Sequence, residues 1–247
     1  WVGHIYKPEL VDDDDISVSG GSEKVNYAVS AGYLTRQGTV GGNFKRANYD
    51  RFTMRENTGF VLFDNSASRT WLNRMEATTS ISYAHINATG ISTNTEYGSP
   101  LGSAMGMSPL LPVLATPEME ESYRTLYPAG FPHLVRNADG VAYSIADGAI
   151  YNEMKNPLAD LTLPGTKYET DKFIANGTVE LQIWGNIKFK TSIGLDMAFW
   201  GNHGHSVEYF LNSKNYNYDT VTENITYDKD GKPTVNIKNN YASGASQ

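Results

Sequence analysis

Two neighbouring segments in the second half of the chain, residues 167–184 and 187–200, alternate apolar and polar side chains almost without exception. Successive side chains of a β-strand point to opposite faces, so this period of two predicts a pair of strands, each with one apolar and one polar face. The segments are 18 and 14 residues long. Strands of soluble proteins usually have about 5–6 residues, whereas membrane-spanning strands need about 9–11. The length of the segments therefore favours the strands of a membrane barrel.

The same alternation recurs in the first third of the chain and predicts the remaining strands. They are expected at residues 1–8, 15–20, 24–36, 49–63 and 71–88. No run of 18 apolar residues occurs, which argues against membrane-spanning helices. A barrel strand alternates apolar and polar residues, so its mean hydropathy is low, and a low mean hydropathy does not argue against a barrel. The predicted fold class is all-β: an antiparallel transmembrane β-barrel segment of about seven strands with long extracellular loops.

Short and long connections between these strands follow each other in strict order. The short ones are at residues 20–23, 64–69 and 185–186, and the long ones at 37–48, 89–166 and 202–247. In an up-and-down barrel this order places every short turn at one rim and every long loop at the other, as in outer-membrane barrels. Aromatic rings, which favour lipid–water interfaces, stand at strand ends at Trp71, Tyr83, Trp184 and Trp200.

Two of the long connections contain local structural signals. Residues 117–126 are predicted to form a short helix, because Thr116 can cap its first turn and Pro117 suits the first helical position. Residues 222–237 are predicted to form a hairpin inside the last loop.

Composition narrows the classes of function. The net charge of −7 argues against nucleic-acid binding, which needs a basic patch. The chain has no cysteine, so disulfides and thiolate metal sites are excluded. The chain opens on Trp1 and ends in polar sequence at Gln247, and we expect it to be a fragment of a longer precursor.

Five blocks of sequence follow one another between residues 16 and 197. They read ISVSGGSEKVNYAVSAGYLTRQGTVGG, NYDRFTMREN, EYGSPLGSAMGMSPLLPV, NPLADL and VELQIWGNIKFKTSIGLDM. In order and spacing these blocks closely resemble the early barrel of SusC-like TonB-dependent outer-membrane transporters. Any single block is a weak signal, whereas the ordered set is specific.

The resemblance implies a 22-stranded barrel around a plug domain, of which residues 1–247 would hold the first strands. It also implies active import of oligosaccharides or peptides across the outer membrane of a Gram-negative type of cell. The implied partners are the TonB complex, a SusD-like surface lipoprotein that acts as a lid, and outer-membrane lipid. The plug and the segment that engages TonB would lie before Trp1.

Two sets of residues are candidates for contact with a partner or substrate. The polar strand faces would point into the lumen and carry Arg51, Arg55, Glu76, Glu180, Gln182, Lys188, Lys190 and Asp196. Aromatic rings of the long loop that could stack on sugars are Tyr97, Tyr123, Tyr127, Phe131 and Tyr143. For any single residue of the polar faces we favour hydration of the wall, and an aromatic ring of a long loop is as often part of the loop's own packing.

No nucleophile elbow, phosphate-binding loop or catalytic triad pattern occurs, so we predict no enzyme activity and no cofactor. His203, His205 and Glu208 are candidate metal ligands by residue type. They follow a Gly-Asn pair in a loop without a convincing further ligand, which favours a solvated loop.

Two other functions are compatible with the strand pattern. One is a soluble, secreted β-sandwich that binds carbohydrate, whose strands would form two packed sheets about 10 Å apart. The other is a passive porin-type barrel without a plug. Extraction separates the first from a barrel, because only a barrel requires detergent.

Overall fold

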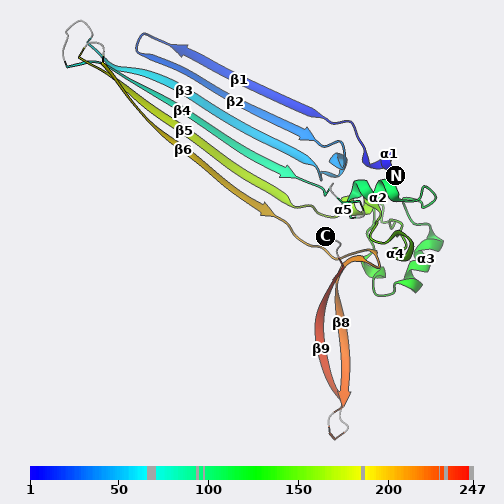
Figure 1. Ribbon diagram of the computed structural model, residues 1–247. Coiled ribbons are helices and arrows are strands. Elements are labelled where there is room, and N and C mark those ends of the chain that lie inside the picture. Colours follow the sequence, from blue (N-terminus) through cyan, green and yellow to red (C-terminus); the bar gives the residue numbers. More distant parts are fainter. Residues whose placement is uncertain are drawn as a thin grey trace.

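A single large antiparallel sheet dominates the structure, which is a computed structural model that describes residues 1–65, 71–92, 95–96, 98–184, 187–227, 229–230 and 233–244. Its six strands pair in chain order: β1 (Val11–Gly21), β2 (Val25–Gln37), β3 (Asn48–Asp64), β4 (Leu72–Thr89), β5 (Lys167–Ile183) and β6 (Ile187–His203). Figure 1 shows these long strands side by side, with a helical module at one end of the sheet. The predicted all-β, antiparallel class is confirmed.

The connections of this sheet separate by length, as the sequence predicts. β1–β2, β3–β4 and β5–β6 are joined at the end of the sheet remote from the helices, which we call the turn end. The connections β2–β3 and β4–β5 are at the other end, the loop end. Residues 66–70 and 185–186 of the predicted short turns lie outside the described residues.

The loop end carries a module of short helices. They are α1 (Val2–Ile5), η1 (Gly42–Phe44), α2 (Pro100–Gly106), α3 (Pro117–Leu126), η2 (Phe131–His133), α4 (Gly148–Tyr151) and α5 (Pro157–Thr162). A second, three-stranded sheet follows, made of β7 (Tyr209–Asn212), β8 (Asn215–Tyr227) and β9 (Pro233–Gly244). β8 and β9 form the predicted hairpin with longer strands, and they extend away from the module in Figure 1.

The buried hydrophobic core lies in this module and in the parts of β7 and β8 that pack against it, rather than in the large sheet. One cluster gathers around Tyr123 and Phe210, another around Ile5 and Leu161, and a third around Tyr143. Because the module has its own core, it can hold a fixed shape beside a sheet that offers it little buried surface.

Side-chain caps determine where two of the module's helices begin. Thr116 Oγ1 accepts a hydrogen bond from the Met119 amide at 3.3 Å and Pro117 occupies the first turn of α3, which confirms the prediction. Asn156 caps α5, and its Nδ2 also donates to the carbonyls of Val113 (2.8 Å) and Ser144 (3.1 Å). The fully buried Asn156 amide thus connects α5 to two other segments of the module.

Two predicted strands differ from the structure. Residues 1–8 do not form a strand: they contain α1, and within the segment Tyr6 makes one isolated bridge to Val40. Ile5 is fully buried against Ala104 and Leu161, and packing of this side chain overrides the weak alternation. β1 starts at Val11 rather than at residue 15, since its aspartates continue the ladder with β2.

We expect Asn156→Ala to destabilise the module by about 2–4 kcal/mol, because it removes a helix cap together with the side-chain donor to the carbonyls of Val113 and Ser144. Amide hydrogen exchange of residues 113–161 in the full-length protein measures this loss. The exposed Asn202→Ala serves as control, and equal exchange in both variants would contradict the assigned role.

Candidate functional site

The pairing register places all eight predicted lumen-facing residues on one face of the large sheet, the polar face. Residues directly opposite each other in antiparallel strands share a face. Glu180 lies opposite Glu76 in β4 and Lys190 in β6. Arg55 is opposite Ser82, Ser82 is opposite Ile174, and Ile174 is opposite Asp196. Arg55 and Asp196 therefore lie on the same face, three strands apart. Alternation within each strand brings Arg51, Gln182 and Lys188 to the same side.

The opposite side, the apolar face, leaves many large hydrophobic side chains exposed. It carries Ile16, Val18, Tyr27, Phe52, Met54, Phe60, Ile81, Phe189, Ile193, Leu195, Met197 and Phe199. Ile193 is 79% and Phe199 64% exposed. A contiguous apolar surface of this extent marks a site that lipid or a partner covers.

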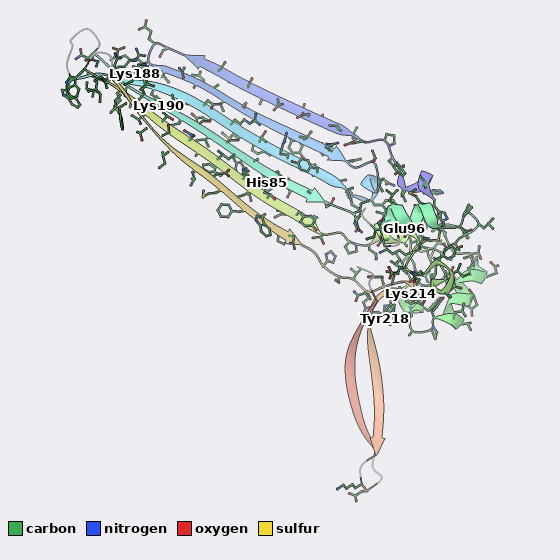
Figure 2. The ribbon with its side chains drawn as sticks, in the orientation of Figure 1. His85, Glu96, Lys188, Lys190, Lys214 and Tyr218 are labelled. Atoms are coloured by element: carbon green, nitrogen blue, oxygen red, sulfur yellow. The ribbon has the colours of Figure 1, made fainter. Side chains whose placement is uncertain are left out.

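Charged residues at the turn end of the polar face form an ion-pair network. Arg74 bonds Asp64 at 3.1 Å and also pairs with Glu76, and Lys188 bonds Glu180 at 2.9 Å. A cavity of 300 Å³ lies among these side chains. Figure 2 shows Lys188 and Lys190 at this end of the sheet. Arg74 was not predicted as a site residue, although its spacing of two from Glu76 places both side chains on one face.

Two arginines of β3 differ from these paired residues. Within the described ranges, Arg51 and Arg55 have no ion-pair partner, and Arg51 Nε is buried without a hydrogen bond. Between them and the turn-end network lies a neutral hollow of 470 Å³ lined by Asn26, Asn57, Thr78, Ser80 and Asn176. The polar face is therefore divided into charged and neutral bands along the strands.

The predicted loop aromatics lie in the core and edge of the helical module. Tyr123 is 6% and Tyr143 9% exposed. The Tyr123 hydroxyl accepts a hydrogen bond from the Ile145 amide at 3.1 Å, and burial raises the pKa of this hydroxyl, an effect that the hydrogen bond opposes. The Tyr143 hydroxyl accepts from Thr162 at 3.1 Å.

Two further rings of this set keep partial exposure at the edge of the module. Tyr127 packs on Phe210 with ring centroids 5.2 Å apart, and the Arg124 guanidinium lies 4.1 Å from the centroid of the Phe131 ring. Tyr97 lies outside the described residues. Contact of these rings with a substrate stays a prediction.

The candidate metal ligands His203 and Glu208 contact side chains other than each other. His203 Nε2 lies 3.5 Å from Glu169, while Glu208 lies 3.2 Å from His133 Nδ1. The part of the chain that the structure describes has no group of three metal-ligating side chains. Nor does any helix within it have the length and hydropathy to cross a membrane.

We expect Tyr123→Phe to destabilise the module by about 1–3 kcal/mol, because the Ile145 amide would lose its buried acceptor. Thermal unfolding of the full-length protein, with tryptic cleavage of residues 90–166 as the readout, measures the change. Tyr127→Phe is the matched control, since no hydrogen bond of its hydroxyl is found among the described residues. An unchanged midpoint for Tyr123→Phe would contradict the structural role.

Comparison with known proteins adds one relationship. No family model matches the chain. The chain is 25% identical over 206 residues to the TonB-dependent receptor SusC of Bacteroides thetaiotaomicron. The match covers 80% of the chain and 18% of that receptor, so the chain spans less than a fifth of the relative's length. This similarity supports a distant relationship to TonB-dependent receptors.

Proposed function

We propose that this chain is part of the barrel wall of an outer-membrane transporter that imports its substrate actively through TonB. The observation that carries the proposal is the segregation of one sheet into an exposed apolar face and a polar face along strands of 11 to 18 residues. A membrane barrel needs this combination, because lipid covers one side of its wall and water or a plug covers the other.

The dimensions of the apolar face agree with a bilayer. Along β5, ten residue steps separate Ile183 at the turn end from Phe173, and this face becomes polar at Asp171. At roughly 3.4 Å per residue this is about 34 Å along the strand. A strand tilt of about 40° reduces it to roughly 26 Å, close to the band of about 25 Å in outer-membrane barrels.

Both outer edges of the sheet are consistent with a barrel that continues beyond the described strands. β1 and β6 each pair with one neighbour, in the described part of the chain. Unpaired backbone groups are not tolerated in lipid, so in our proposal further strands of the protein complete the wall.

The finer functional assignments follow from the resemblance. In this proposal the substrate is an oligosaccharide or a peptide, and a SusD-like lipoprotein covers the barrel on the side of the loop module. The partly exposed rings of Tyr127 and Phe131 and the polar face contact substrate or plug, and the chain performs no bond chemistry. A carbohydrate-binding sandwich would need a second sheet on the apolar face, whose side chains are instead exposed in the described residues.

Arginine substitutions distinguish the two faces. We expect Leu195→Arg on the apolar face to cost about 2–4 kcal/mol, because a cation would enter the lipid near the midplane. Ser192→Arg, three residues away in β6 on the polar face, should cost far less. Urea unfolding of the full-length protein in lipid vesicles measures both, and equal costs would exclude a lipid-facing apolar side.

Localisation and energy coupling test the function itself. We expect the native protein in the outer-membrane fraction, extracted by detergent, and we expect uptake of its substrate by the cell to stop when TonB is deleted. A panel of labelled oligosaccharides and peptides, compared with a strain lacking this protein, identifies the substrate. Recovery without detergent, or uptake that persists without TonB, would refute the proposal.

A further inference from the structure

A polar cavity lies at the loop end of the apolar face, beyond the row in which Phe52 is opposite His85 and His85 is opposite Asp171. It measures 340 Å³, and its charged and amide-bearing residues are Lys45, Asn48, Asp50, Asn87, Lys167 and Glu169. Asp50 lies opposite Asn87, and Asn87 lies opposite Glu169, so β3, β4 and β5 form one continuous row here. Figure 2 labels His85, which precedes Asn87 by two residues in β4 and lies between this row and the middle of the sheet.

The positive groups of this cavity are available to a ligand. Lys45 and Lys167 are both exposed, and neither has an ion-pair partner in the described residues. The carboxylates, by contrast, have neighbours: Asp50 accepts a hydrogen bond from Thr35 Oγ1 at 2.5 Å, and Glu169 lies 3.5 Å from His203. The two ammonium groups can bind a phosphate, while the two carboxylates of the same hollow require that the ligand also carries hydrogen-bond donors.

The cavity also has an unused hydrogen-bond acceptor. Asn48 Oδ1 is buried and has no hydrogen-bond partner, which is a costly state unless a donor fills it. The carboxylates of Asp50 and Glu169 add further acceptors at the same place. A matching ligand therefore carries hydroxyl or amide donors beside its phosphate.

The loop that supplies Lys45, together with Asn48 at the start of β3, is held in place over the end of β4. Thr89 Oγ1 accepts from the Asn48 amide at 2.9 Å and donates to the Lys45 carbonyl at 3.3 Å. Lys45 itself has a left-handed backbone, with φ of 56°, a conformation that is costly for a side-chain-bearing residue. The cavity wall is thus built by defined contacts of the loop.

Part of the surface next to the cavity is apolar, and the row of Phe52 also holds the His85–Asp171 pair, whose Nδ1 and Oδ1 atoms lie 2.8 Å apart. Phe52 and Met54 follow Asp50 at steps of two along β3, and they are 38% and 48% exposed on the apolar face. A molecule with its head in the cavity would lay its tail on these side chains. A lipid combines a polar head with apolar tails in this way, whereas a free phosphate would make no contact with the apolar surface.

We propose that this cavity binds the phosphorylated headgroup of a membrane lipid, with Lys45 and Lys167 on the phosphate and with Asn48, Asp50 and Glu169 accepting from its hydroxyl or amide groups. The acyl chains lie on Phe52 and Met54. This inference rests on the proposed function, since it takes the apolar face to be in contact with lipid.

The experiment measures lipid binding by native mass spectrometry of the full-length protein purified in mild detergent, with lipid A as the probe. We expect Lys45→Ala/Lys167→Ala to weaken binding of lipid A about tenfold or more, because each lysine near a lipid surface contributes about 1 kcal/mol. Lys7→Ala/Lys24→Ala, which removes two exposed lysines outside the cavity, should bind like the unaltered protein. Heat-dependent mobility on gels confirms that each variant is folded.

Two further probes identify what is recognised. Diacylglycerol, which has tails without phosphate, should bind weakly and without dependence on the two lysines, and excess inorganic phosphate should not displace lipid A. Equal binding of lipid A by both double variants would overturn the proposal, as would displacement by inorganic phosphate, which would indicate a site for a free anion. If the protein needs no detergent, the transporter assignment fails as well. If it is membrane-bound and lipid binding ignores the lysines, this inference alone fails.

Discussion

The continuous antiparallel register of six long strands is the constraint on which the other features of this molecule depend. Because opposed residues share a face, a single misaligned strand would bring its apolar side chains onto the polar face. Irregularities in the register occur near the turn end, at Val61/Phe63 and Leu72/Arg74. Across the middle of the sheet the ladder is unbroken, and the two faces stay separate from β1 to β6.

The sheet and the helical module are stabilised in different ways. The module has clusters of buried hydrophobic residues around Tyr123, Ile5 and Tyr143, together with buried amides such as Asn156 that satisfy backbone carbonyls. The sheet has backbone ladders and few buried side chains, so its apolar face gains stability from what covers it. Lipid on that face, as we propose, would be as much a part of the folded state as the core of the module.

The distribution of charged side chains changes along the strands, from the turn end to the loop end. The turn end of the polar face has paired charges around Arg74 and Glu180, the middle has amides and hydroxyls, and Arg51 and Arg55 lie farther toward the loop end. On the other face, Glu56 lies among apolar side chains, and toward the loop end polar residues begin at His85 and Asp171 and continue at Asp50, Asn87 and Glu169. One face of these strands thus carries an apolar belt with a polar edge, and the other face carries polar side chains. This arrangement suits a wall between lipid and an aqueous interior.

The amino-acid sequence by itself determined the long strands, their two faces and the helix at Pro117–Leu126, because alternation and capping are local properties of neighbouring residues. The eight polar-face residues could be assigned to one side for the same reason. Only the tertiary structure decided that residues 1–8 form α1, where burial of Ile5 outweighs local pattern. It also decided that Tyr123 and Tyr143 pack inside the module, and that Lys45, Asn48 and Lys167 meet in one cavity. These outcomes depend on contacts between residues far apart in the chain, and no local periodicity encodes such contacts.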